Sequence, residues 1–553
     1  MSAASWSSAA FVPARVVPAP APSATYTAGP PASAATSAAA SAGSAAGCRR
    51  TTLAAATLVA AGGVAAARQG RPSRRRARRG SVVTAAATAE KLEVLTVPAS
   101  WEALREQFLS TDVGQSFLKK DQDRDAGLLP NNDAKVRYFG ESREKPRVML
   151  YRDMAAWCPY CQKVWLLLEE KGIDYEISKV PMRSYGDKPD SFMKKVPRGL
   201  LPAIEIDGKL MLDSLDIMFA IESKFPDAGR PMFPPPGAQR DLARRLLELE
   251  RSVFGAWCGY LFRPEMPFVG SNTNDFERSL KEMDAELSMN KESRWFLPYQ
   301  HPTIVDMQYV SHMERTVASA LFYKGYDIRK KFPNIDAWLA AFEELPYYMA
   351  SKSDFYTHCM DIPPQYGPPF PSDDSDVKNL RLDLTPKIGR FPVAWDKDAE
   401  PLTKAQKTMT DPQRGAEAAW ALMRNYEAIV KFTSRPAGQG VGDWGRGNPY
   451  RSELADPYAK PGTELVPGLS ALLMLVAASL SGQYGKTNRK TLAEATRKVV
   501  AETGLAQVVK AADCLEYLCM RVGVPRDMSM PAAKVLRATL NEVSDCLRYN
   551  ARG

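Results

Sequence analysis

Apolar and polar positions alternate in distinct patterns along the middle of the chain. Residues 148–151 form a compact apolar run, as expected of a buried strand. Apolar residues then recur at helical spacing from Val164 to Leu168, and Gly172 is the expected cap. Further extended segments are expected at 175–177, 203–206 and 209–212, and the last two are joined by the hairpin signal Asp207-Gly208. A helix should follow these strands and end near Pro226.

This order of strands and helices predicts a thioredoxin-like α/β domain over residues 146–232. After a proline-rich link, Leu242 to Trp257 place apolar residues on one helical stripe. Thr303 and Asp306 have the spacing of a helix cap at the start of another helix. An all-α domain is therefore expected over residues 238–355.

The remaining segments differ in composition. Residues 90–145 mix charged and apolar positions, which favours a helical lead-in. Residues 356–461 are rich in proline and glycine, which predicts a linker interrupted by one helix at 412–433. Residues 462–553 are again helical in pattern and long enough for a small core of their own. We expect an α-helical extension of unknown role that makes few contacts with the preceding domains.

The first 89 residues carry ten arginines and neither lysine nor acidic residues. The chain's net charge of +10 therefore falls to 10 − 10 = 0 without them, which removes the argument for a nucleic-acid partner. Such a segment is typical of a disordered transit peptide, and its proline and serine content favours a plastid, with the stroma as compartment, over a mitochondrion. The uncharged run 51–67 is mostly Ala, Gly and Thr, so no permanent membrane anchor is expected.

Two of the eight cysteines, Cys158 and Cys161, have CxxC spacing between the predicted strand and helix. The helix N-terminus favours the thiolate of the first cysteine, and the second lies one turn inside, where it can resolve a mixed disulfide. A zinc half-site or two structural cysteines are the alternatives. The three histidines are not grouped with cysteines at structural-zinc spacing, so no metal site is expected.

Two further pairs of residues suggest a peptide-like ligand. A cis bond between Leu201 and Pro202 would expose main-chain groups opposite the thiol, although a proline can also simply begin a strand. Asp213 and Ser214 are at the start of a helix. The Ser214 hydroxyl and the free amides of the helix N-terminus suit the α-carboxylate of a γ-glutamyl group, and the Asp213 carboxylate suits its ammonium. Asp and Ser are also common helix caps, which is the plainer interpretation.

In this order and spacing, these landmarks resemble the glutathione transferase superfamily over residues 146–355, and the dithiol resembles its cysteine-type, glutaredoxin-like and omega-like classes. Thr303, Asp306 and the Phe332-Pro333…Trp338 pattern resemble that superfamily's C-terminal domain. The resemblance implies that glutathione is the cosubstrate, that Cys158 is the catalytic thiol, and that glutathione is held by Leu201, Pro202, Asp213 and Ser214.

Some features depart from the family pattern. Asp213 stands where the family usually has Glu, and the basic contact to the glycine carboxylate is ambiguous among Lys179, Arg183 and Lys188. The second cysteine shifts the expected chemistry towards disulfide exchange.

We therefore expect a glutathione-dependent thioltransferase that reduces mixed disulfides or a small oxidant such as dehydroascorbate or a quinone. A transferase-like scaffold without turnover is the alternative. A homodimer, and a protein partner for the extension, stay open.

Overall fold

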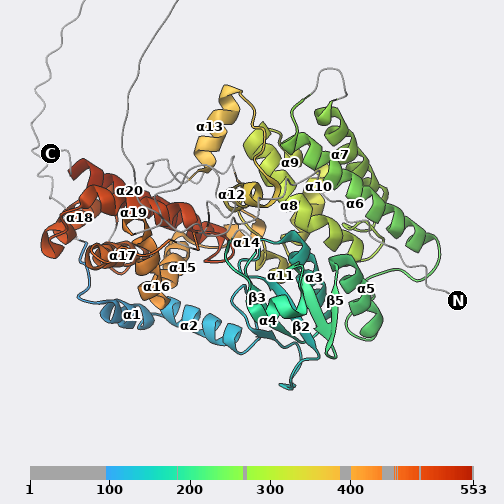
Figure 1. The fold of residues 1–553 in the computed structure, drawn as a ribbon, viewed down its shortest axis with the longest axis horizontal. Helices are drawn as coiled ribbons and strands as arrows, with labels where there is room; N and C mark the ends of the chain where they lie inside the picture. The colour runs from blue at the N-terminus through green and yellow to red at the C-terminus, as the bar shows by residue number, and fades with distance from the viewer. Residues whose placement is uncertain are drawn as a thin grey trace, which may run out of the picture. The chain divides into compact units, whose positions relative to one another are not determined.

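Residues 136–212 contribute the five strands of one mixed sheet (Figure 1). The computed structural model describes residues 95–182, 185–265, 271–385, 400–438, 454, 456–457, 459–484 and 487–550, so the expected leader lies outside it. The strands are β1 (Val136–Arg137), β2 (Val148–Asp153), β3 (Tyr175–Val180), β4 (Ala203–Ile206) and β5 (Lys209–Leu212). Their order is β1-β3-β2-β4-β5, and β2 runs parallel to β3 and antiparallel to β4.

The helices α3 (Pro159–Lys171), α4 (Asp190–Lys195) and α5 (Ser214–Lys224) connect and follow these strands. The predicted thioredoxin-like α/β domain is confirmed by the sequence β2-α3-β3 followed by β4-β5-α5. The sheet begins earlier than residue 146, because Val136 of β1 pairs with Glu176 of β3. A two-residue edge strand is too short to appear as an apolar pattern, which is why the sequence did not predict it.

The all-α region expected after the sheet is also present. Its helices are α6 (Ala238–Phe262), α7 (Asn272–Met289), α8 (Ile304–Lys324), α9 (Ile328–Lys331), α10 (Pro333–Phe342) and α11 (Pro346–Met349). The predicted cap forms, since the Asp306 carboxylate accepts from the Thr303 amide at 2.8 Å and from the Trp338 indole at 3.0 Å. Helix α8 is buried over nearly its whole length, between α3, α6 and α12 (Phe355–Tyr366).

The prediction of a single helix within 356–461 is wrong. Besides α12, the described residues of this segment form α13 (Ser375–Leu384), α14 (Lys404–Lys407), α15 (Asp411–Arg424), α16 (Tyr426–Thr433) and the 3₁₀ turn η2 (Arg435–Ala437). Helix α12 continues through Pro363 and Pro364. Packing explains this, because α12 lies against α8, where Cys359 is buried and its carbonyl accepts from the Tyr323 hydroxyl at 2.7 Å. Tertiary contacts outweigh the low helix propensity of proline.

The C-terminal extension consists of α17 (Val466–Ser481), α18 (Arg489–Thr503), α19 (Val508–Arg521) and α20 (Met530–Asn550). The sequence suggested that these helices form a core by themselves. The core instead also includes residues of α1 (Trp101–Leu109), α2 (Asp112–Asp125), α15 and α16. Trp101, for example, stacks on Tyr426 at 4.9 Å and donates to the Ser470 hydroxyl at 2.9 Å. Helix α17 is apolar on nearly all sides, so α18, α19 and α20 alone would leave part of its apolar surface exposed.

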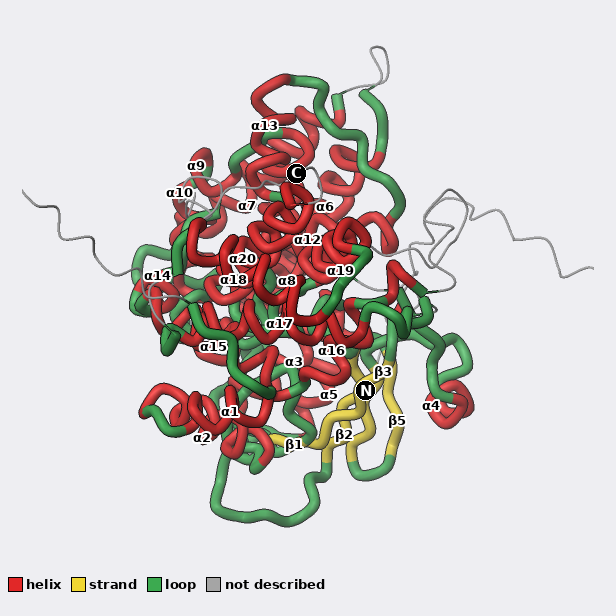
Figure 2. Tube along the Cα trace, turned by 90° about the vertical axis from the view of Figure 1, so that its left-hand side faces the viewer, coloured by secondary structure: helices red, strands yellow, loops and turns green. Residues whose placement is uncertain are grey.

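Figure 2 shows the strands as one group, with helices forming most of the remaining described chain. Within those residues, no helix combines the length and the apolar character needed to cross a bilayer.

Candidate active site

The dithiol lies where β2 passes into α3. Cys158 is the N-cap of α3 and Pro159 occupies its first turn, where the missing amide costs no helical hydrogen bond. Cys161 lies one turn inside and is 1% exposed, and burial raises the pKa of its thiol well above the ordinary value. Ala156 in the connecting turn has a φ of 63°, a left-handed conformation that a residue with a Cβ rarely adopts. The predicted strand-dithiol-helix arrangement is thus present.

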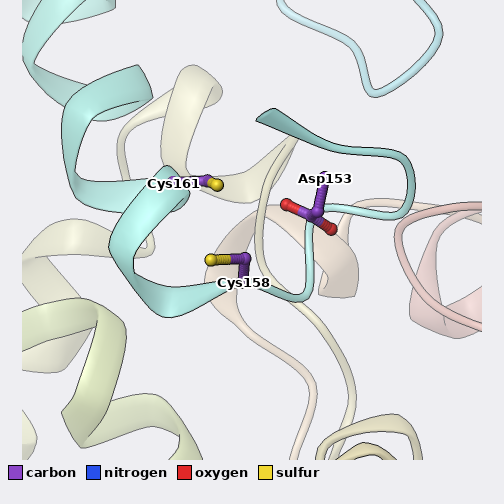
Figure 3. A group of neighbouring side chains, drawn as sticks. All are labelled: Asp153, Cys158 and Cys161. Carbon is purple, nitrogen blue, oxygen red and sulfur yellow. The ribbon is translucent and has the colours of Figure 1, made fainter. Parts of the chain in front are cut away.

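Asp153, which no sequence motif indicated, is the third member of this site. It ends β2, is 1% exposed, and its Oδ2 accepts from the amides of Ala155 at 3.1 Å and Trp157 at 2.8 Å. Its Oδ1 has no hydrogen-bond partner among the described residues. A carboxylate oxygen of Asp153 and the sulfurs of Cys158 and Cys161 all lie within 4.8 Å of one another. Figure 3 shows the Cys161 sulfur and the Asp153 carboxylate pointing toward each other.

Helix α8 supports the dithiol turn from the interior. The Arg315 guanidinium donates to the main-chain oxygen of Trp157 at 2.6 Å and to the Gln162 side chain at 3.0 Å. Gln162 in turn donates to Glu314 at 3.2 Å, and Glu314 lies 3.1 Å from the His358 Nε2. Burial lowers the pKa of His358 to about 4. The signal in the sequence was the group of polar residues at 311, 312 and 314–316 within an otherwise buried helix.

The C-terminal extension reaches the same turn through residues 522–527. The Trp157 indole donates to the Val524 carbonyl at 2.9 Å, and the Ser353 hydroxyl donates to the same oxygen at 2.6 Å. The Arg526 guanidinium lies 4.8 Å from the centre of the Trp157 ring. The expectation of few contacts between extension and core is therefore wrong, because the residue before Cys158 is bound by the extension.

The residues predicted to hold glutathione lie at the ends of β4 and β5. The Leu201–Pro202 peptide bond is cis, as expected, with Leu201 half-buried and Pro202 buried. Asp213 is exposed, and its carboxylate accepts from the Leu215 amide at 3.1 Å, so the cap interpretation also describes it. Ser214, the first residue of α5, is 7% exposed.

The basic residues considered for the glycine carboxylate of glutathione differ in their surroundings. Lys179 is bound to Asp133 at 3.1 Å, and Arg183 lies outside the described residues. Lys188 is half-buried, which lowers the pKa of its ammonium, and it lies within electrostatic reach of Cys161, Cys158 and Asp153. Of the two lysines, Lys188 is therefore the one beside the dithiol.

Lys163 of α3 is a further cation near this site, and no sequence motif indicated it. It is 2% exposed and donates to the Gln308 side chain at 2.7 Å. Burial lowers the pKa of its ammonium to about 8, against the charges of Glu250 and Asp213. A buried cation thus lies within electrostatic reach of the exposed Asp213.

Residues 157–224 match the glutathione S-transferase N-terminal domain. Glutathione S-transferase L1 of Arabidopsis thaliana is 27% identical over 239 residues, which cover 42% of this chain and 91% of that protein. The chloroplastic glutathione S-transferase DHAR3 of the same plant is 39% identical over 79 residues, 14% of this chain and 29% of that protein. The crystal structure of Chlamydomonas reinhardtii dehydroascorbate reductase superimposes with a TM-score of 0.31 and 19% identity, over 39% of this chain and 96% of that chain. The chain is thus similar to the N-terminal domain of glutathione S-transferases over residues 157–224, and to an almost whole glutathione transferase over 42% of its own length.

Proposed function

We propose that this protein is a glutathione-dependent thiol-disulfide oxidoreductase with Cys158 as nucleophile and Cys161 as resolving cysteine. The observation that carries the proposal is the position of Cys158 at the N-cap of α3 with a second, buried thiol one turn inside. Relatives named as glutathione transferases support the choice of glutathione as cosubstrate. The scaffold alternative does not account for a free thiol at a helix N-cap with a second free thiol one turn inside the helix.

In the first step, the Cys158 thiolate attacks the glutathione sulfur of a mixed disulfide. The Cys158–glutathione bond forms as the original S–S bond breaks, and the departing thiolate takes up a proton. Cys161 then attacks the Cys158 sulfur and releases glutathione, which leaves an intramolecular disulfide. Two further glutathione molecules reduce that disulfide and leave as glutathione disulfide, so two electrons pass in each cycle. Alternatively, a second glutathione attacks the mixed disulfide directly.

Asp153 supplies the base that the resolving step needs. Because burial raises the pKa of Cys161, this residue is a protonated thiol at neutral pH and a poor nucleophile. The Oδ1 of Asp153 has no hydrogen-bond partner among the described residues, and a carboxylate oxygen of Asp153 lies within 4.8 Å of the Cys161 sulfur. We assign Asp153 as the acceptor of the Cys161 proton when that sulfur attacks.

Glutathione is expected to bind along the cis-proline edge of the sheet. Main-chain groups at Leu201 and Pro202 would pair with its cysteinyl residue, while Asp213 and Ser214 would hold the γ-glutamyl end at the start of α5. Lys188, which lies beside the dithiol, is our choice for the glycine carboxylate.

The proposal is tested with purified protein, glutathione and a glutathionylated peptide, with glutathione disulfide formation as the readout. Cys158→Ser should lose activity by about a hundredfold or more, whereas Cys161→Ser should retain a monothiol activity. Dehydroascorbate and a quinone, assayed in parallel, identify the oxidant. Turnover by Cys158→Ser equal to that of the unaltered protein, or capture on immobilised glutathione without any turnover, would favour the scaffold instead.

We place this activity in a plastid because of the arginine-rich, acid-free leader. Mass spectrometry of the native N-terminus tests this, with a start expected between Ser81 and Glu90. Recovery of peptides from the first 79 residues in the mature protein would contradict it.

A further inference from the structure

Two thiols and one carboxylate converge at the end of β2 and the start of α3. Asp153, Cys158 and Cys161 each offer one atom of a type that binds metal ions, and these atoms lie within 4.8 Å of one another. All three residues are at most 6% exposed. The sequence predicted no metal site because the two cysteines supply only two ligands and no histidine lies at structural-zinc spacing from them. The third group comes from the preceding strand (Figure 3).

The separation of these atoms suits a small thiophilic ion. Zinc–sulfur bonds of about 2.3 Å and zinc–oxygen bonds of about 2.0–2.2 Å place ligand atoms of a tetrahedral site roughly 3.5–3.8 Å apart. The observed limit of 4.8 Å is within about 1 Å of that spacing, a difference that side-chain rotation can remove. The two cysteines already contact one another through a side-chain hydrogen bond.

The Asp153 carboxylate is oriented but incompletely satisfied. Its Oδ2 is held by the amides of Ala155 and Trp157, which fixes the plane of the group. Its Oδ1 is buried without a hydrogen-bond partner among the described residues, a state that is costly for a charged oxygen. A cation at the centre of the cluster would satisfy that oxygen.

The charges at the cluster also balance with a divalent ion. Two thiolates and one carboxylate carry −3, and a divalent ion brings the total to −1. Lys188, the lysine within electrostatic reach of all three groups, offsets the remainder. Thiolate ligands select soft or borderline ions such as Zn²⁺ or Cd²⁺ over Mg²⁺ or Ca²⁺.

We propose that the reduced dithiol and Asp153 form a three-ligand site for a thiophilic divalent cation. Binding forms two metal–sulfur bonds and one metal–oxygen bond and releases the two thiol protons, with no transfer of electrons. Exchange with an external disulfide, which accepts two electrons and leaves as two thiols, joins the two sulfurs and removes both thiolate ligands, so the intramolecular disulfide and the metal exclude each other. A bound cation would thus keep the dithiol reduced and block thiol exchange. The site requires only these three groups, and therefore stands independently of the glutathione chemistry proposed above.

The experiment is a Cd²⁺ titration of the reduced full-length protein, followed by the thiolate-to-Cd²⁺ charge-transfer band in the ultraviolet. We expect one equivalent to bind, and Cys158→Ser and Cys161→Ser to abolish this band. Asp153→Asn, which preserves size and can still accept from both amides, should weaken binding by about tenfold or more. Asp361→Asn is the matched control, because Asp361 is a buried carboxylate on α12 outside the cluster. Competition with a chromogenic chelator gives the affinity for Zn²⁺.

A second measurement needs no variant. Protein whose dithiol has been oxidised beforehand should bind no Cd²⁺ at this site, and reduction should restore binding. Equal affinity of Asp153→Asn and the unaltered protein, with circular dichroism showing both folded, would overturn the three-ligand site. Absence of the band in the reduced protein would also overturn it. Disulfide turnover, measured separately, reports on the enzymatic proposal and not on this one.

Discussion

The indole nitrogen of Trp157 donates a hydrogen bond to the main-chain oxygen of Val524, 2.9 Å away and 367 residues later in the chain. Trp157 is fully buried and immediately precedes Cys158. Arg315 of α8 holds the same turn through a second contact, since its guanidinium donates a hydrogen bond to the Trp157 carbonyl. Cys158 is therefore positioned jointly by the sheet, by α8 and by the C-terminal extension.

The first prediction concerns removal of the extension. Expression of residues 90–361 alone should give an insoluble or inactive product, although a Pro- and Gly-rich linker suggested the reverse. Truncation removes Val524 and Arg526 from Trp157, and it strips α1 and α2 of the core that they share with α15 and α17. Solubility, circular dichroism and disulfide reduction test this. A soluble fragment as active as the full chain would show that the contacts to Trp157 do not matter for activity.

The second prediction concerns the close approach of Gly523 to Trp157. A Cβ added at Gly523 would lie 2.5 Å from the Trp157 Cζ2, so either the ring or the loop must move. We expect Gly523→Ala to cost about 1–3 kcal/mol in the free energy of unfolding and to alter the rate of Cys158 alkylation. Gly140→Ala is the control, since a Cβ there meets nothing within 4 Å. Equal stability and alkylation for the two variants would contradict the close packing.

The third prediction concerns acid stability. Burial holds the folded-state pKa of His358 near 4, below its ordinary 6.5, so between these values the unfolded chain binds more protons. Stability should therefore fall as the pH drops from about 6.5 to about 4, by an amount on the order of 3 kcal/mol from this group. Urea unfolding at several pH values measures the loss, and His358→Gln should make it smaller. An identical pH dependence in the variant would remove His358 as its cause.

The sequence revealed those parts of the fold and site that are local. Strand 148–151, the cap at Thr303 and the dithiol depend on neighbouring residues, and each is present in the structure. Asp153 could have been suspected, because it ends the strand directly before the dithiol turn. Its orphaned oxygen, however, depends on how that turn folds back on it.

Other features depend on pairings across long stretches of chain. The contacts of Gly523 and Arg526 with Trp157 are an example, because nothing near these two residues in the sequence points to Trp157. Helix α12 contains Pro363 and Pro364, and only its packing against α8 accounts for it. The core of α17 likewise needs α1, which lies more than three hundred residues earlier. Patterns of hydrophobicity predict that such surfaces are covered, but not by what.

The last prediction separates the roles of Asp153 and Cys161 in turnover. Asp153→Asn should slow the attack of Cys161 on the Cys158–glutathione disulfide by about tenfold to a thousandfold, because the amide cannot accept the thiol proton. Formation of that mixed disulfide should proceed at the unaltered rate, since it does not require Cys161. The two steps are followed by quenching the reaction with acid and counting bound glutathione by mass spectrometry. Raising the pH should restore the rate of the second step in the variant, as hydroxide replaces the missing base. A purely structural role for Asp153 would instead slow both steps at every pH, and the position of Trp157, held by the same carboxylate, would then be its main contribution.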